Sequence, residues 1–68
     1  MSNTMKNFGR NLYIALFDKK MSRKELAEKV GVSQQLISCY VSGERSPSTA
    51  TLIKIANALG VTVDSLIK

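Results

Sequence analysis

Residues 22–43 read SRKELAEKVGVSQQLISCYVSG and carry the signals of two short helices joined by a tight turn. Ser22 can cap the first helix, and Glu25 three residues later completes a capping box. Gly31 can adopt the left-handed conformation that ends a helix, and Ser33 can cap the helix that follows. The stretch therefore predicts a helical pair, with the turn placed between Gly31 and Ser33.

These signals predict one helix over residues 23–30 and a second over residues 34–42, which Gly43 ends. The apolar positions expected to face a core are Leu26, Ala27 and Val30 in the first helix, and Leu36, Ile37, Tyr40 and Val41 in the second. The remaining positions of both helices are mainly polar, so each is expected to present one face to solvent.

Three further helices are predicted outside this pair, over residues 5–19, 49–59 and 63–67. Their expected inward positions are Phe8, Leu12, Ala15 and Leu16, widened by Tyr13, Ile14 and Phe17; then Leu52, Ile53, Ile55, Ala56 and Leu59; and finally Val63, Leu66 and Ile67. No strand pattern competes with them. We expect an all-α fold, in which residues 1–68 form one compact domain of five helices.

The composition narrows the class of protein. The 68 residues carry a formal net charge of +5, which favours a polyanionic partner, although a generally basic surface explains it equally well. Cys39 is the single cysteine and histidine is absent, so neither an internal disulfide nor a histidine-cysteine metal cluster is expected. A lone thiol suits a reducing compartment.

Other functional classes find little support in the sequence. No apolar run approaches the roughly 20 residues of a membrane span, and the N-terminus lacks a signal-peptide pattern, so we expect a cytoplasmic protein. Without histidine, a phosphate-binding glycine loop or paired acids, the chain offers few groups for catalysis. We expect no enzyme activity, no cofactor, no metal and no small-molecule ligand.

The second helix of the pair carries side chains that suit base recognition in duplex DNA. In a helix-turn-helix, the second helix enters the major groove and its first turn reaches the base edges. Glutamine can bond bidentately to the N6 and N7 edge of adenine. The candidate base contacts are Gln34, Gln35, Ser38 and Cys39. Taken alone, two glutamines are more often an ordinary solvated helix start; their position after the turn favours base recognition.

Phosphate contacts are expected around this surface, because helix N-termini present unpaired amides that hold anions. The candidates are Arg23, Lys24, Ser33, Ser42, Arg45 and Ser48. Arg45, in the loop after the second helix of the pair, is the strongest of them. Cys39 has a competing interpretation as a redox sensor, which the absence of a second cysteine disfavours.

The sequence resembles the phage repressor and Cro type of helix-turn-helix protein along almost its whole length. The resemblance lies in residues 26–38 (LAEKVGVSQQLIS), Gly43 and residues 52–61 (LIKIANALGV), with residues 8–10 and 64–67 fitting its two ends. It implies a five-helix, lambda-repressor-like domain that binds double-stranded DNA and regulates transcription. By the same resemblance, Gln34, Gln35, Ser38 and Cys39 fall at the family's base-reading positions.

Two positions depart from the family's usual pattern. Members often carry an arginine where this chain has Leu16 and a glutamate where it has Val41. Replacing both partners of a buried ion pair by apolar residues is often neutral or stabilising, so we predict that Leu16 and Val41 touch. Cys39 stands where long polar residues are frequent, which weakens its claim to a base contact.

The resemblance also implies a repressor that acts by occupying a palindromic operator as a homodimer. Val63, Ile67 and the outward side of the helix over residues 49–59 are the candidate dimer contacts. The alternative is a protein-interaction adaptor or an antitoxin-type regulator with the same fold, in which the glutamines are surface residues and the charge is incidental.

Overall fold

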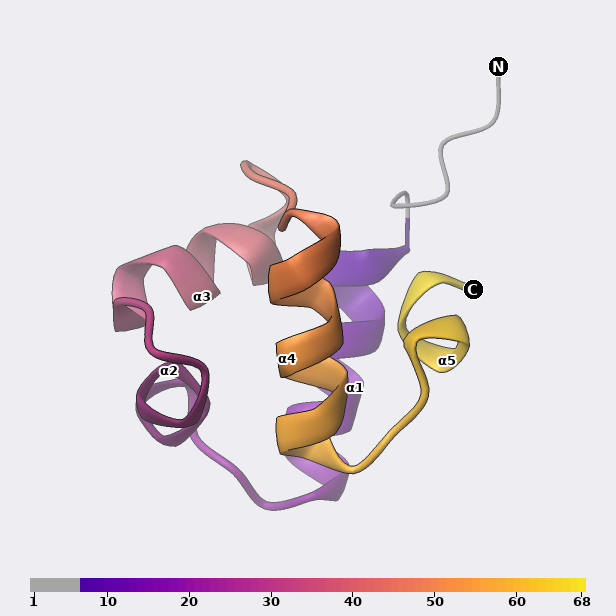
Figure 1. The fold of residues 1–68 in the computed structure, drawn as a ribbon, viewed down its shortest axis with the longest axis horizontal. Helices are drawn as coiled ribbons and strands as arrows, with labels where there is room; N and C mark the ends of the chain where they lie inside the picture. Colours follow the sequence, from indigo (N-terminus) through magenta and orange to yellow (C-terminus); the bar gives the residue numbers. More distant parts are fainter. Residues whose placement is uncertain (1–6) are drawn as a thin grey trace.

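The computed structural model describes residues 7–68 and shows a small bundle of five helices (Figure 1). The helices are α1 (Phe8–Asp18), α2 (Arg23–Val30), α3 (Gln34–Ser42), α4 (Thr49–Leu59) and α5 (Val63–Ile67). Within residues 7–68 there is no strand, which confirms the all-α expectation. No helix in this part of the chain is long and apolar enough to cross a bilayer.

The first helix is shorter than the predicted 5–19. Positions 5 and 6 lie outside the described residues, Asn7 precedes the helix and Asp18 is its last residue. The helix ends there because the Lys20 amide donates to the Phe17 carbonyl at 3.1 Å and the chain turns away. Lys20 takes a positive φ of 53°, which no helix interior accepts. The other four helices have the bounds that the sequence predicts.

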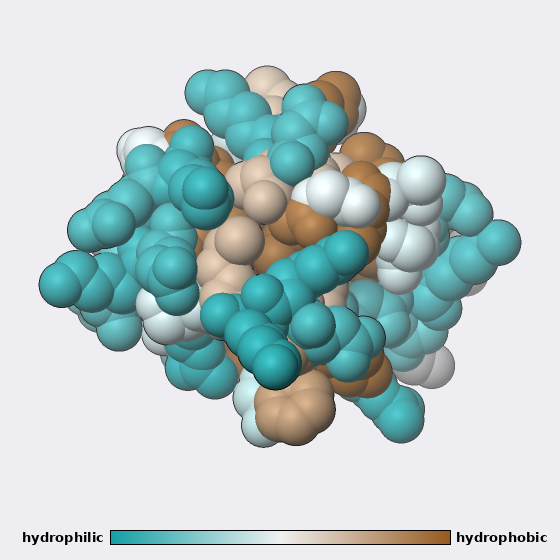
Figure 2. Space-filling view, turned by 90° about the horizontal axis from the view of Figure 1, so that it is seen from below, coloured by the Kyte–Doolittle hydropathy of each residue, from teal (hydrophilic) through white to brown (hydrophobic). Residues whose placement is uncertain are grey.

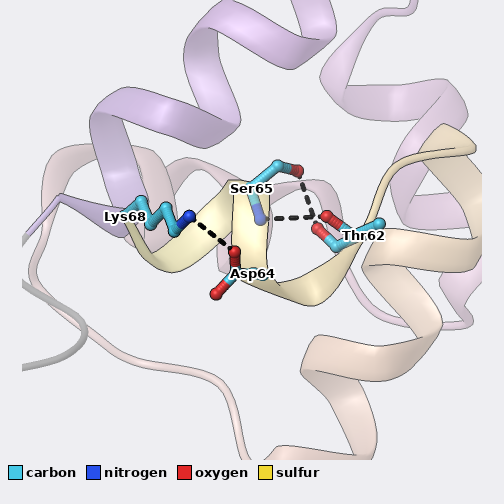
Figure 3. A network of polar contacts seen from close by, with 4 residues as sticks. All are labelled: Thr62, Asp64, Ser65 and Lys68. Carbon is cyan, nitrogen blue, oxygen red and sulfur yellow. Dashed lines mark hydrogen bonds and ion pairs between the residues drawn. The ribbon is translucent and has the colours of Figure 1, made fainter.

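Hydroxyl side chains begin the four helices after α1. Each side-chain oxygen accepts a hydrogen bond from the amide three residues later, an arrangement that satisfies one free donor of the first turn. The caps are Ser22, Ser33, Ser48 and Thr62. At Ser22 the predicted capping box is complete, because the Glu25 carboxylate accepts from the Ser22 amide at 3.0 Å. The cap of α5 appears in Figure 3, beside an exposed ion pair between Lys68 and Asp64.

A single apolar core joins all five helices. Its fully buried side chains include Leu12, Leu26, Ile37 and Ile55, one from each of α1 to α4, and Leu66 closes it from α5. Helix α1 packs against α3 and α5, while α2 packs against α3 and α4. The bundle thus supports the helical pair from behind. Leu16 is buried and Val41 half-buried against this core, and their mutual contact stays a prediction.

Four apolar side chains predicted to face inward are exposed instead. They are Tyr13, Ile14 and Phe17 on α1, with 56, 45 and 77% of their surface exposed, and Ile53 on α4, with 46%. On α1, Phe8, Leu12 and Leu16 already take the buried side. The expected widening of the inner stripe was wrong because, at about 100° per residue, Tyr13 and Phe17 are turned away from it.

Helix α1 and helix α3 meet at a position without a side chain. A Cβ atom built on Gly9 would lie 2.5 Å from the Val41 carbonyl oxygen and 2.8 Å from that of Tyr40. Beside this contact, the Phe8 and Tyr40 rings pack edge to face with centroids 6.2 Å apart. The backbone of α1 therefore sets how closely the C-terminal half of α3 approaches it.

Side chains of α1 and its preceding residue also hold the end of α5. The Asn11 side-chain amide donates to the Leu66 carbonyl at 2.9 Å, and the Asn7 amide donates to the Lys68 carbonyl at the same distance. Carbonyls at a helix C-terminus have no partner within the helix. Asn7 and Asn11 supply such partners and tie the last helix to the first.

Candidate nucleic-acid interface

The turn between α2 and α3 fixes the relative position of the two helices. Gly31 takes the left-handed conformation with a φ of 84°, and the amides of Gly31 and Val32 both donate to the Ala27 carbonyl. Ser33 then caps α3 by accepting from the Leu36 amide at 3.1 Å. Backbone groups at the end of α2 and at the start of α3 thus find hydrogen-bond partners within the three residues 31–33, so the conformation of the turn has little freedom to vary.

Helix α3 has a buried side and an exposed side, as the sequence predicts. Ile37 and Tyr40 are buried in the core. Gln34 and Gln35 are exposed in the first turn, where no hydrogen bond to another described side chain occupies their amides. The two other base-contact candidates, Ser38 and Cys39, are half-buried.

Four of the candidate residues line one shallow cavity of about 160 Å³ at the side of α3. Its lining consists of Ser33, Gln35, Leu36, Cys39 and Arg45. The Arg45 side chain is exposed, and its backbone amide donates to the Cys39 carbonyl at 3.3 Å. The structure thus brings two predicted base contacts and two predicted phosphate contacts together. Cavities that enclose small molecules are usually about 300–1,000 Å³, so this hollow is better suited to a surface contact.

A hydrogen bond between α2 and α3 involves two further candidates. The Arg23 guanidinium donates from Nη1 to the Ser38 hydroxyl oxygen at 3.4 Å. Ser38 can still donate its own proton outward, because the oxygen acts here as acceptor. Sequence reasoning proposed both residues for DNA contacts and missed that they contact each other. No sequence signal marks this pair, since the two residues lie in different helices.

Ser33 keeps a free donor although it serves as a cap. Its oxygen accepts from the Leu36 amide, so its proton can be donated to an approaching phosphate. Lys24 is exposed on the first turn of α2 and makes no ion pair with a described residue. Both side chains are exposed and can reach solvent, and their contact with phosphate stays a prediction.

Ser42 and Ser48 are less available. The Ser42 hydroxyl donates to the Cys39 carbonyl at 3.1 Å and lies 3.3 Å from the Glu44 carboxylate, whose negative charge would repel a phosphate. The Ser48 hydroxyl accepts from the Thr51 amide and donates to the Thr51 hydroxyl. Local hydrogen bonds engage both side chains: Ser48 caps α4, as the residues around Pro47 predict, whereas the sequence did not indicate the engagement of Ser42.

The described geometry agrees with what comparison with known proteins shows. Residues 16–66 match the family described as helix-turn-helix, HTH_3. The chain belongs to this family. The helix-turn-helix match includes the whole of α2, α3 and α4 together with the end of α1, so it covers both the helical pair and most of its support.

Several relatives of this helix-turn-helix chain carry regulatory names. It is 36% identical over 61 residues to the uncharacterised HTH-type transcriptional regulator YqaE of Bacillus subtilis, covering 90% of the chain and 53% of the relative. It is 34% identical over 61 residues to YonR, an SPbeta prophage-derived HTH-type transcriptional regulator of the same organism, covering 90 and 56%. Multiprotein-bridging factor 1 of Saccharomyces cerevisiae is 38% identical over 55 residues, covering 81% of the chain and 36% of that protein.

The chain spans about half the length of the two Bacillus subtilis relatives. It carries a helix-turn-helix domain of the type that binds DNA in transcriptional regulators. Enzymes are not typical of this family.

Proposed function

We propose that this protein binds double-stranded DNA in a sequence-specific manner and regulates transcription, with α3 in the major groove. The observation that carries the proposal is the exposure of Gln34 and Gln35 in the first turn of α3. They directly follow a turn in which hydrogen bonds satisfy the end of α2 and the start of α3. A glutamine amide held there can bond to the N6 and N7 edge of adenine. Ser38 and Cys39, one turn further along, contribute secondary base contacts.

Phosphate contacts orient the helix in the groove. Arg45 and Ser33 border the same hollow as Gln35, so one phosphate on the flank of α3 can meet a guanidinium and a hydroxyl together. Arg23 and Lys24 lie at the start of α2, where the free amides of the first turn also attract anions. In the proposed complex Ser42 and Ser48 contribute less, because their hydroxyls are already bonded.

We infer further that the protein represses transcription by occupying a palindromic operator as a homodimer. Two recognition helices about 34 Å apart would enter successive major grooves on one side of the duplex. The exposed Ile53 on α4, together with the half-buried Val63 and Ile67, forms the proposed dimer contact. A regulator of this kind works in the compartment that holds the DNA, which fits a cytoplasmic protein.

Selection of bound sequences from a random duplex pool, followed by fluorescence anisotropy, tests the proposal. We expect Gln35→Ala to lose about 1–3 kcal/mol of discrimination between the selected duplex and a scrambled one. Arg45→Ala should instead weaken binding to both duplexes alike and lower the salt dependence. Equal affinity of the unaltered protein for the two duplexes would contradict sequence-specific binding.

A second candidate function is that of a protein-interaction adaptor or antitoxin-type regulator. The likeness to multiprotein-bridging factor 1 favours it, because the name of that relative describes the joining of proteins. This function predicts no preference between the selected and the scrambled duplex. The same titration therefore separates the two candidates.

A further inference from the structure

Helix α1 presents an apolar ridge to solvent that DNA recognition does not explain. Of the large hydrophobic side chains in the described residues, four are notably exposed, and three of them, Tyr13, Ile14 and Phe17, lie together on α1. Spacings of three and four residues bring these side chains to one face of a helix. We propose that this α1 ridge is a docking surface for an acidic amphipathic helix of another protein.

The ridge lies between two hollows. On one side Ile14 borders a cavity of about 230 Å³ between α1 and α5, whose lining includes Ala15, Val61 and Leu66. On the other side Tyr13 and Phe17 border a cavity of about 210 Å³ that reaches the start of α2. Helices pack when the side chains of one fill the grooves of the other. A partner helix lying along α1 can place one row of apolar side chains on each side of the ridge.

The charges around the ridge favour an acidic partner. Arg10 lies one turn before it, Lys19 borders the first cavity, and Arg23 borders the second. Lys20 follows Lys19 in the chain, and Asp18, just before Lys19, is the one acid beside these basic residues. No ion pair within the described residues occupies any of these basic groups, because the single one found joins Lys68 to Asp64. Carboxylates flanking the apolar row of a partner would pair with this basic rim.

The surface itself shows the same arrangement. Seen from below the view of Figure 1, apolar surface shows between hydrophilic side chains, and an apolar group protrudes at the lower edge of the molecule (Figure 2). An apolar patch rimmed by charged residues is typical of a protein contact.

A second copy of this chain fits the ridge less well. In a twofold dimer the same surface of both copies would meet. The four basic groups and one acid of one copy would then face the same predominantly positive set on the other. Nucleic acid also fits less well, because the acidic Asp18 follows Phe17 and lines the first cavity, and Ile14 offers no ring for base stacking.

A peptide titration tests the inference without relying on DNA binding. The probe is a labelled helical peptide with leucines at positions i, i+3, i+4 and i+7 and glutamates between them. Its controls are a scrambled peptide of the same composition and a version with lysine in place of glutamate. We expect anisotropy to show saturable binding of the acidic peptide alone, weakened about tenfold or more by Phe17→Ser.

Matched variants distinguish binding at this ridge from non-specific binding to exposed apolar side chains. Ile53→Ser removes an apolar side chain on α4 that is 46% exposed and lies outside the ridge, and it should leave peptide affinity unchanged. Absence of saturable binding, or equal binding of the lysine peptide, would overturn the inference. So would loss of a dimer on Phe17→Ser in sedimentation, which would assign the ridge to a second copy, or an equal loss of single-stranded oligonucleotide binding, which would assign it to nucleic acid.

The outcome does not depend on the function proposed for α3. Phe17→Ser should leave affinity for the selected duplex unchanged, whereas Gln35→Ala should leave peptide affinity unchanged. If the duplex titration fails, the proposed function is contradicted and the docking surface on α1 still stands. If the peptide titration fails, the docking surface is contradicted and the proposed function still stands.

Discussion

The outer faces of α3 and α1 are both exposed, yet they are composed differently. On α3, Gln34 and Gln35 present amides from a helix with a serine cap at its start and a left-handed glycine after its end. On α1, Tyr13 and Phe17 present rings from a helix with no side-chain cap and with Lys20 in the left-handed conformation after its end. The comparison separates a surface suited to directional hydrogen bonds from one suited to apolar packing.

The largest effect is expected where these two helices touch. Gly9→Ala should lower the free energy of unfolding by about 1–3 kcal/mol, because the added methyl group would press on two backbone carbonyls of α3. Chemical denaturation measures the loss. Arg10→Ala, at the next and exposed position, should change it by less than about 0.5 kcal/mol. An unchanged stability for Gly9→Ala would mean that α3 shifts without cost.

The cap of α3 allows folding and DNA binding to be separated. Ser33→Ala should cost about 1 kcal/mol of stability, since the Leu36 amide loses its acceptor. Ser33→Asp should keep the stability, because aspartate also caps helices, while its charge weakens binding to every duplex. Denaturation and anisotropy on both variants check this. If Ser33→Asp bound duplex DNA as tightly as the original, Ser33 would not lie near a phosphate.

At the end of α1, a substitution should increase the stability of the protein by a smaller amount. Lys20→Gly should stabilise the protein by up to about 1 kcal/mol, because glycine adopts a φ of 53° without the steric cost that a side chain incurs. Lys19→Gly is the matched control, since Lys19 has a φ of −88° that any residue accepts and the change should not stabilise. Thermal unfolding of both variants decides the matter, and equal melting temperatures would contradict the assigned strain.

The smallest effect should come from the ridge itself. Phe17→Ser should change the free energy of unfolding by less than about 0.5 kcal/mol, because 77% of the Phe17 side chain is already in solvent. A loss well above 1 kcal/mol in chemical denaturation would show that Phe17 stabilises the fold, which would remove the reason to seek a partner for it.

The sequence predicted the local structure well where capping residues mark it. Serine and threonine caps and the glycines at helix ends are local signals, so the bounds of α2 to α5 followed from them. On α1, where such signals are missing, the predicted span of about residues 5–19 was longer than the observed helix. Tyr13, Ile14 and Phe17 were wrongly placed inside, because apolar character alone does not say which side of a helix has neighbours.

In the candidate site, too, some features could be predicted from the sequence and others could not. The exposure of Gln34 and Gln35 follows from the period of the helix and was foreseen. The hydrogen bond from Arg23 to Ser38 depends on how two helices meet in space, and the engagement of Ser42 with Glu44 depends on the conformation of the turn after α3. Neither has a signature in the one-dimensional pattern.

The side-chain-free contact at Gly9 has a consequence for how recognition can change. Helix α3 rests against main-chain atoms at its C-terminal half, while its exposed residues Gln34 and Gln35 lie at the opposite end and take no part in that contact. The amino acids at these two positions can therefore be exchanged for others without moving the helix that carries them. Under the proposed function, such a domain would acquire a new target sequence through substitutions at these two positions while its frame stays the same.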